Sequence, residues 1–349
     1  MKTTTFGVDL AKRVFQVHWV DMDTGEINRR QFKREQLVTF FAKQAPALVA
    51  MEACGSAHYW ARRFASFGHE VRLIAPSFVR PFVKRNKTDV ADAQAIWEAA
   101  QRPDMRFVAV KSEAQQAVLT LHRVRQQLLK MRRMQINQMH GLLYEFGAAM
   151  HRGSHGMTDA ARLLGELADT LPAMVIDTLR EQLQRIEALT RDIHAIERRL
   201  TAWQRHDEAA ARLCAIPGVG LLSATAAIAT IGQANTFRSG REFAAFIGLV
   251  PRQSGTGGRV KLLGISKRGD VYLRTLLIHG ARSVLSHPKH LTDSLQRLLA
   301  RRPFNVAVVA LANKMARTIW ALLAHARTYQ PPLRGARCVE RQLTMETGR

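Results

Sequence analysis

Two carboxylates stand three residues apart in the segment Asn86-Lys87-Thr88-Asp89-Val90-Ala91-Asp92-Ala93, at the start of an expected helix. Side chains at positions i and i+3 share one helical face, so Asp89 and Asp92 point the same way. Like charges held this close repel each other, and a hard divalent cation such as Mg²⁺ binds oxygen ligands of this kind. The alternative interpretation is that Thr88 caps the helix and that acids are favoured at its positive N-terminus.

Two further acidic residues stand upstream, each at the end of an expected β-strand. Asp9 ends the strand expected over 3–10, and Glu52 follows the buried-type run Ala47-Leu48-Val49-Ala50-Met51. The remaining expected elements are strands at 14–20, 27–32 and 71–75, a helix at 36–43, a helix after Gly55 and the helix 89–100. Functional groups gather where the strands of such sheets end, so we expect the four acids to meet at one edge. Each upstream acid taken alone is equally typical of a solvated strand end.

The order of these four acids resembles that of the RNase H-like nucleases. It is most similar to the Holliday-junction resolvase, or RuvC-like, branch, whose last helix carries an Asp-x-x-Asp pair. The resemblance implies an N-terminal α/β domain in which Asp9, Glu52, Asp89 and Asp92 bind Mg²⁺ or Mn²⁺.

Charge is the strongest signal in the composition. Lys and Arg number 52 against 28 acids among 349 residues, a net charge of +24, which indicates a polyanionic partner, with nucleic acid as the first candidate. A membrane surface is the alternative, but we find no apolar run of the ~18 residues that a spanning helix needs. Residues 1–5 enter a strand and do not resemble a signal peptide. The three scattered cysteines predict neither disulfides nor a zinc site, so we expect a cytoplasmic protein.

The middle of the chain, 112–205, is expected to be helical. Apolar residues recur at near-heptad spacing from Leu121 to Met131 and from Leu179 to Trp203, which predicts a long helical hairpin or a coiled coil. Two ordinary core helices are the alternative, whereas a coiled coil would favour an oligomer. The opposite face carries basic residues that we expect to contact nucleic acid unless they are simply solvated: Arg123, Arg125, Lys130, Arg132 and Arg133.

The segment Ile216-Pro217-Gly218-Val219-Gly220 resembles the hairpin of helix-hairpin-helix DNA-binding motifs. In such hairpins, glycines such as Gly218 and Gly220 let backbone N–H groups approach a phosphate at a helix N-terminus. The alternative is a plain turn in which glycine allows tight packing. Helices are expected at 221–231, 271–286 and 305–324, followed by a disordered tail at 329–349.

A glycine-rich loop is expected after Pro251, and it carries Ser254 among the cations Arg252, Arg259 and Lys261. A serine on a mobile loop among cations suits attack on a phosphate, although a flexible surface hairpin explains the same pattern. The stretch Ser266-Lys267-Arg268-Gly269 follows and adds two more cations that we expect to bind nucleic acid. Ser266 stands before a helix, where a capping role is sufficient.

Together these stretches resemble one family, the bacterial insertion-sequence transposases that join a DEDD resolvase-like domain to a C-terminal serine domain and act as bridge-RNA-guided recombinases. The resemblance runs from Phe6 to Leu323. Its carriers are Gly7–Lys12, Met51–Ser56, Asn86–Ala93, Ile216–Gly220, Phe246–Arg252 and Ser266–Gly269. Cys54 stands where many relatives have threonine, and the Ser254 loop is shorter than in some of them.

The family resemblance implies that Ser254 is the nucleophile and that the four acids are catalytic. It also implies DNA and a guide RNA as partners, a dimer or tetramer as the active form, and a bacterial, nucleoid-associated setting. We expect a RuvC-like domain at 1–105, a helical coiled-coil region at 112–205, and a mainly α-helical serine domain at 210–328. A metal-dependent resolvase that hydrolyses DNA with water, and a non-catalytic nucleic-acid-binding protein, are the alternative functions.

Overall fold

The computed structural model describes residues 3–83, 88–151 and 156–331, and the chain divides into two compact units. The N-terminal unit comprises 1–116 and 231–236, and the C-terminal unit comprises 117–230 and 237–349. The tail expected at 329–349 therefore lies, from 332 onward, outside the described residues.

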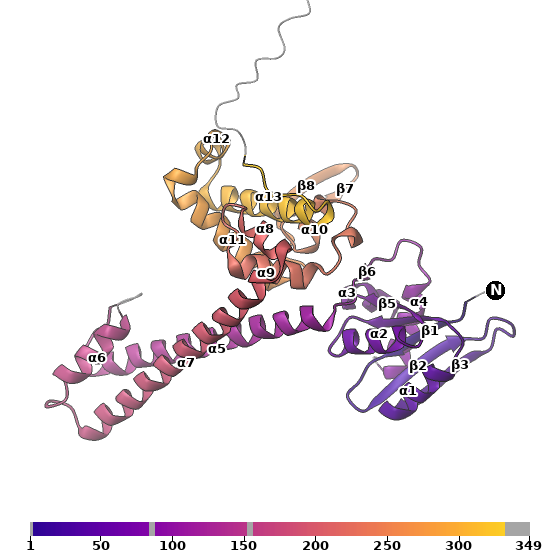
Figure 1. Ribbon diagram of the computed structural model, residues 1–349, viewed down its shortest axis with the longest axis horizontal. Coiled ribbons are helices and arrows are strands. Elements are labelled where there is room, and N and C mark those ends of the chain that lie inside the picture. Colours follow the sequence, from indigo (N-terminus) through magenta and orange to yellow (C-terminus); the bar gives the residue numbers. More distant parts are fainter. Residues whose placement is uncertain (1–2, 84–87, 152–155, 332–349) are drawn as a thin grey trace, which may run out of the picture. The chain divides into compact units, whose positions relative to one another are not determined.

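The N-terminal unit is an α/β domain with one sheet (Figure 1). Its elements are β1 (Thr5–Asp9), β2 (Val14–Val20), β3 (Ile27–Lys33), α1 (Arg34–Lys43), β4 (Leu48–Glu52), α2 (Ala57–Ala65), β5 (Glu70–Ile74), α3 (Pro76–Val79), η1 (Arg80–Phe82), α4 (Asp89–Ala100), β6 (Phe107–Val108) and η2 (Ala234–Thr236). The strand order is β3-β2-β1-β4-β5-β6, with β1, β4 and β5 parallel and the other pairings antiparallel. The expected element order is confirmed, with β6 as an additional short edge strand.

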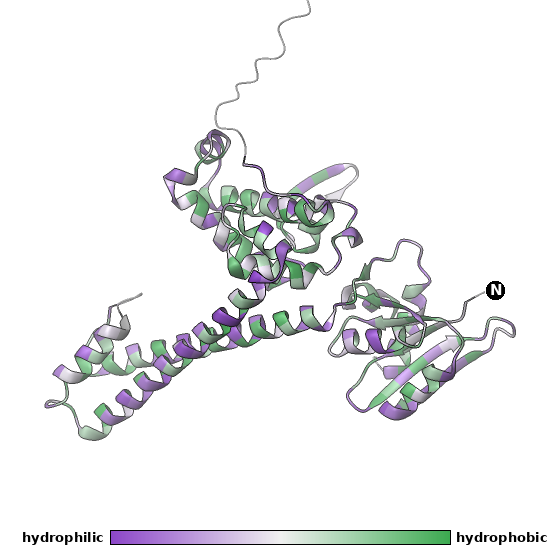
Figure 2. Ribbon diagram, in the orientation of Figure 1, coloured by the Kyte–Doolittle hydropathy of each residue, from purple (hydrophilic) through white to green (hydrophobic). Residues whose placement is uncertain are grey.

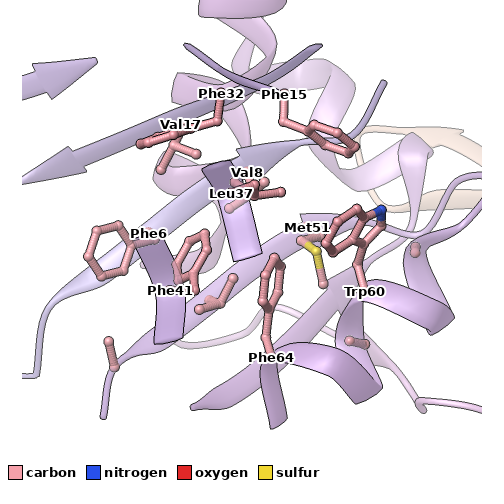
Figure 3. Close-up of a cluster of buried hydrophobic side chains, with 14 of the residues drawn as sticks. Phe6, Val8, Phe15, Val17, Phe32, Leu37, Phe41, Met51, Trp60 and Phe64 are labelled. Carbon is pink, nitrogen blue, oxygen red and sulfur yellow. The ribbon is translucent and has the colours of Figure 1, made fainter. Parts of the chain in front are cut away.

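One face of this sheet packs against α1 and α2 through an aromatic core (Figure 3). Strand side chains alternate between the two faces of a sheet, so Phe6 and Val8 of β1 enter this core while Gly7 and Asp9 face the other way. Its largest fully buried members are Phe15, Phe41, Trp60, Phe64, Leu37, Met51 and Leu73. This alternation decides which strand residues are available to the opposite face.

The opposite face of the sheet is covered by α4. Ala50 of β4 and Ile74 of β5 form a second buried cluster with α4. Trp97 of α4 donates its indole N–H to the carbonyl of Thr5 at 3.1 Å. At Gly7, a Cβ atom would meet the carbonyl oxygen of Ala93 and would lie 2.7 Å from the Trp97 Cβ. The absence of a side chain at Gly7 therefore allows α4 to lie directly on β1.

Gly7→Ala is expected to lower the free energy of unfolding of the N-terminal unit by about 1–3 kcal/mol, because the added methyl group overpacks the contact with α4. Thermal unfolding followed by circular dichroism measures the loss. Gly55→Ala is the matched control, since nothing lies within 4 Å of a Cβ built at Gly55. Equal unfolding temperatures for the two variants would contradict this account of Gly7.

The C-terminal unit is mainly helical, although the first residues of α5 and the last residue of α9 belong to the N-terminal unit. Its elements are α5 (Glu113–Glu145), α6 (Gly156–Glu166), α7 (Ala173–Arg205), α8 (Glu208–Cys214), α9 (Leu221–Ile231), α10 (Gly240–Phe246), β7 (Pro251–Thr256), β8 (Arg259–Ile265), α11 (Val271–Ser286), η3 (Pro288–His290), α12 (Asp293–Arg301) and α13 (Phe304–Ala324). The expected helices 221–231 and 271–286 coincide with α9 and α11. Helix α6 lies within the region 112–205 that was expected to be helical.

Helices α5 and α7 run antiparallel and alongside each other over most of their length (Figure 1). Met139 and Leu143 of α5 share a buried cluster with Leu179 and Leu183 of α7, and near the other end Val118 packs with Leu200. The near-heptad pattern therefore corresponds to a helical hairpin within one chain.

Arg125 corrects the expected basic face of α5. Its guanidinium pairs with the carboxylate of Glu197 on α7 at 2.7 Å, and its side chain is only 13% exposed. Heptad spacing alone placed Arg125 with the outward-facing cations, but it lies where the two helices meet.

The remaining helices of the C-terminal unit pack around apolar, small-residue contacts. Helices α9 and α13 are mostly hydrophobic, whereas α5 and α7 alternate in hydropathy (Figure 2). Among the described residues, α13 is long enough and apolar enough to cross a membrane, judged by length and composition only. This differs from the sequence-based expectation that no apolar run reaches the length of a membrane-spanning helix. Its buried side chains include Val308, Ala312 and Ile319, and Met315 lies against Gly280 of α11. Such contacts are typical of a helix in the core of a globular unit.

A buried histidine joins α5 to α9 and α11. His122 is 1% exposed, and its ring nitrogens lie 2.9 Å from the Tyr272 hydroxyl and 3.0 Å from Thr225 Oγ1. Burial, together with a smaller contribution from the nearby charge of Arg125, lowers the pKa of His122 to about 4. The neutral imidazole is the form that this packing accommodates.

The free energy of unfolding of the C-terminal unit is expected to fall as the pH drops from about 6.5 to about 4. In this range His122 is protonated in the unfolded chain but stays neutral in the folded protein, so protonation favours the unfolded state. The loss would reach roughly 3 kcal/mol at the lower end of that window. Denaturant unfolding of wild type and His122→Gln at several pH values isolates this contribution from that of the carboxylates. An identical pH dependence in both proteins would contradict it.

Candidate active site

Asp9 and Glu52 stand side by side at one edge of the sheet. Strands β1 and β4 are parallel with Val8 opposite Met51, so the residues that follow, Asp9 and Glu52, end the two strands at the same level. Val8 and Met51 enter the core under α1 and α2, which turns both carboxylates toward the α4 face. Both are partly buried.

Helix α4 begins at this same edge. Ala93 and Trp97 lie against Gly7, and Trp97 reaches back to Thr5, so the helix runs from the end of β1 toward its start. Its first turn therefore brings Asp89 and Asp92 to the side where Asp9 lies. Thr88 caps the helix by accepting a hydrogen bond from the Ala91 N–H at 3.2 Å, so the capping role in the alternative interpretation is confirmed. Asp89 is exposed and Asp92 is partly buried, whereas Asn86 and Lys87 lie outside the described residues.

The pKa of the Cys54 thiol is affected by both strand-end carboxylates. Burial raises its pKa, and the charges of Glu52 and Asp9 raise it further. The two carboxylates and the thiol thus share one negatively charged neighbourhood, in which the thiol stays protonated at neutral pH.

Gln16 is the residue at this edge that sequence reasoning missed. It pairs directly with Asp9 across β1 and β2, is 4% exposed, and its Oε1 receives no hydrogen bond from the described residues. The signal in the sequence was a polar residue between the core residues Phe15 and Val17. Its significance depends on the cross-strand register, which the sequence alone did not supply.

Carboxylate oxygens are the ligands that Mg²⁺ prefers. Among the described residues, the acids at this edge do not form a complete set of metal ligands. Within 3–83, 88–151 and 156–331, no group of three or more His, Cys, Asp or Glu side chains is arranged to hold a metal ion. Asp9, Glu52 and the first turn of α4 lie at one edge of the sheet, whereas the expected convergence of the carboxylate oxygens on a common point is not seen among these residues.

Ser254 lies on a two-stranded β-hairpin, which agrees with the surface hairpin that was the alternative to a mobile loop. Strands β7 and β8 are antiparallel, and the turn between them consists of Gly257 and Gly258, with φ of 56° and 78°. A two-residue turn with positive φ at both positions is the preferred connection of a hairpin, and glycine adopts it readily. The glycines therefore build an ordered turn.

The register of this hairpin gives it two different faces. Ser254 is opposite Lys261, and Thr256 is opposite Arg259, so these four side chains share one face. Val260 and Leu262 alternate with them and occupy the other face, 66% and 62% exposed. Arg252 is exposed at an irregularity in the pairing. Ser254 is therefore a solvent-exposed hydroxyl beside two cations.

Ser266 has no capping role. Helix α11 begins at Val271, and Asp270 caps it by accepting a hydrogen bond from the Leu273 N–H at 2.9 Å. The Ser266 hydroxyl is buried and has no hydrogen-bond partner among the described residues. Lys267 and Arg268, which follow, are exposed.

The other expected nucleic-acid residues fall into two groups. On α5, Arg123, Lys130 and Arg133 are exposed, while Arg132 is partly buried and donates to Thr190 Oγ1 at 3.4 Å. The glycines before α9 differ from each other. Gly218 has a φ of 84°, and its carbonyl touches the position of a Cβ at Gly280, so tight packing is sufficient to explain it. A Cβ at Gly220 would meet nothing within 4 Å.

Comparison with known proteins identifies relatives along almost the whole chain. A profile for the DEDD transposase domain of the IS110 type, described as "Transposase", matches residues 6–147, and one described as "Transposase IS116/IS110/IS902 family" matches residues 210–296. The chain is 51% identical to a probable family 20 transposase of Pseudomonas aeruginosa over 95% of its own length and 100% of the relative's.

Two transposases of named insertion sequences are also similar. The transposase of IS1111A from Coxiella burnetii is 45% identical, covering 93% of this chain and 90% of the relative. The transposase of IS1328 from Yersinia enterocolitica is 41% identical, covering 93% of this chain and 98% of the relative. The chain belongs to the IS110/IS116/IS902 family of insertion-sequence transposases.

Proposed function

We propose that this transposase cuts and rejoins DNA strands through a phosphoserine intermediate on Ser254. The observation that carries the proposal is the hairpin face on which Ser254 is exposed beside Lys261 and Arg259. Cations so placed would stabilise the negative charge that develops on an attacked phosphate. Serine Oγ would form the new P–O bond, the departing DNA hydroxyl would take up a proton, and a second DNA hydroxyl would later reverse the exchange. The ester conserves the phosphodiester bond energy, so rejoining requires no ATP.

The acids of the N-terminal unit would form the second half of the site, in an RNase H-like, RuvC-like domain. Asp9 and Glu52 would hold a divalent cation, Mg²⁺ or Mn²⁺, with Asp89 and Asp92 turning their carboxylates toward it. When bound, such a cation polarises a phosphoryl oxygen. A serine hydroxyl is a weak nucleophile without activation, and no histidine lies within 251–265. Ser254 would therefore meet these acids in a composite site, within one chain or between two.

A guide RNA and an oligomer complete the proposal. Exposed cations such as Arg123, Lys130, Arg133, Lys267 and Arg268 can contact nucleic-acid backbones without reading sequence. Sequence choice would then come from base pairing with a bridge RNA. Strand exchange between two duplexes also requires several active sites together, so the active form would be a dimer or tetramer.

A hydrolytic, metal-dependent resolvase is the second candidate. It is favoured by the separation of the acids and Ser254 into different compact units, because hydrolysis by water would need only the acidic edge. In that case Ser254 would have a structural role.

The test of the proposed function begins with the RNA that copurifies with the protein from cells carrying the whole element. A single structured species from the element's flank is expected on sequencing. Protein loaded with it should then recombine a DNA carrying the element ends with a target, in the presence of Mg²⁺. Recombination that is unaffected by ribonuclease would refute RNA guidance, and cleavage without rejoining would favour the resolvase.

A further inference from the structure

We propose that Gln16 supplies a neutral oxygen ligand to the divalent cation of the acidic edge, the edge of the sheet at which Asp9 and Glu52 end their strands. Gln16 is on β2, a strand that carries no acid, and it lies outside the motifs by which the chain resembles its family. The inference rests on the proposed function, in which the acids hold Mg²⁺ or Mn²⁺, and it adds a ligand of a different chemical class.

The side chain of Gln16 faces α4. Its neighbours on β2, Phe15 and Val17, both enter the aromatic core on the opposite side of the sheet. Side chains alternate along a strand, so Gln16 points toward the α4 face. His18, two residues along, shares this face and packs its ring against Trp97 of α4, with the ring centroids 5.6 Å apart. Gln16 lies nearer than His18 to the edge at which α4 begins.

Three polar residues form a row across neighbouring strands at the acidic edge. Gln16 of β2 is directly opposite Asp9 of β1, and Glu52 ends β4 at the same level on the other side of Asp9. Side chains directly opposite each other in an antiparallel pair have Cβ atoms about 4.5–5.5 Å apart. The amide of Gln16 and the carboxylate of Asp9 can therefore contact one ion between them.

The amide oxygen of Gln16 is buried without a partner. The residue is 4% exposed, and its Oε1 receives no hydrogen bond from the described residues. Buried polar side chains in proteins are normally hydrogen-bonded, so this atom indicates a group that binds there. Ionised carboxylates nearby cannot satisfy it, because they only accept hydrogen bonds, as the amide oxygen does. A cation between Gln16 and Asp9 would satisfy both oxygens.

A neutral ligand suits the charge of the acidic edge. Asp9, Glu52 and the pair Asp89 and Asp92 in the first turn of α4 carry, when ionised, more negative charge than one divalent cation neutralises. Carboxylates that share one site repel each other. Amide carbonyl oxygens are also suitable ligands for Mg²⁺ and Mn²⁺, and they add no charge. Gln16 would thus add an oxygen ligand without adding to the repulsion.

The experiment measures Mn²⁺ binding to the full-length protein without nucleic acid, by isothermal titration and by the shift in unfolding temperature between EDTA and Mn²⁺. Gln16→Met keeps the length of the side chain but removes the amide. It is expected to weaken Mn²⁺ binding about tenfold and to reduce the shift that Mn²⁺ induces. In EDTA its unfolding temperature should equal or exceed that of wild type, because a buried oxygen without a partner has been removed.

Gln16→Glu tests the oxygen separately from the amide N–H groups. It keeps an oxygen at this position and adds a charge beside Asp9, so the unfolding temperature should fall in EDTA. Its Mn²⁺ binding should be at least as tight as that of wild type. Gln31→Met is the matched control, since Gln31 lies opposite Gln16 on β3, one strand further from Asp9, and is exposed. Its Mn²⁺ affinity should be unchanged.

A lower unfolding temperature of Gln16→Met in EDTA with unchanged Mn²⁺ affinity would overturn the proposal, because Gln16 would then serve folding only. Loss of Mn²⁺ binding in Gln16→Glu would also overturn it, since the N–H groups and not the oxygen would be required. Wild type that binds no Mn²⁺ would overturn the cation site and this ligand together. An absent protein–DNA adduct, with Mn²⁺ binding that depends on Gln16, would instead refute the phosphoserine function and leave the ligand assignment intact.

Discussion

Ser254→Ala is expected to abolish the covalent protein–DNA adduct while leaving nucleic-acid binding unchanged. The side chain is exposed on the hairpin, so losing its hydroxyl should not disturb folding. If Ser254 Oγ forms the phosphoester, strand exchange should fall by on the order of 10³-fold or more, as it does when other nucleophiles are removed. The measurement is a denaturing gel of protein incubated with guide RNA, element-end DNA and Mg²⁺.

Two serine and threonine variants serve as controls for this result. Thr256→Ala removes a hydroxyl from the same hairpin face two residues along, and Ser266→Ala removes the buried hydroxyl near α11. Both should still form the adduct. An adduct that persists in Ser254→Ala but disappears in Ser266→Ala would show that the nucleophile was assigned wrongly. Cleavage without an adduct in any variant would establish the hydrolytic resolvase.

Asp9→Asn and Glu52→Gln are each expected to reduce DNA cleavage by on the order of 10³-fold, because each removes a carboxylate charge from the proposed cation site. The unfolding temperature should stay equal or rise, since the two acids end adjacent strands and repel each other. Cleavage assays and thermal unfolding on the same preparations separate these effects. Asp23→Asn, at an exposed turn of the same unit, is the control.

Loss of activity together with a large fall in unfolding temperature would mean that the acids act structurally. Full activity in both variants would restore the simplest interpretation, that these are solvated strand-end acids. Isothermal titration with Mn²⁺ gives an independent readout, since binding should weaken in Asp9→Asn and stay unchanged in Asp23→Asn.

Much of the fold could be predicted because local patterns and tertiary environment agree. The strand at 14–20 alternates, and the helix at 271–286 follows the capping residue Asp270, so both were placed correctly. Strand β6 has only two residues and is defined by its pairing with β5. No local sequence pattern predicts this pairing. The sequence alone did not distinguish the hairpin of β7 and β8 from a mobile loop, because glycine occurs in flexible segments and in tight turns alike.

The candidate site divides in the same way. Strand ends of a parallel pair meet at one edge, so the neighbourhood of Asp9 and Glu52 followed from their positions in the chain. Contacts that depend on strand register or on helix packing could not be predicted from positions in the chain. Gln16 lies opposite Asp9 in the antiparallel pairing of β1 and β2. Arg125 donates a hydrogen bond to Glu197, which is 72 residues away in the sequence.

The two-residue turn of the hairpin has a consequence for how tolerant this gene is of small insertions. Side chains along a strand repeat with a period of two, so shifting one strand by a single position exchanges the faces. An insertion that shifted β8 by one position against β7 would leave Ser254 in place but turn Val260 and Leu262 toward it, with Lys261 and Arg259 on the far side. Under the proposed function, such a shift would remove both cations from the face of the nucleophile, so strand exchange should fall even in a protein that keeps Ser254.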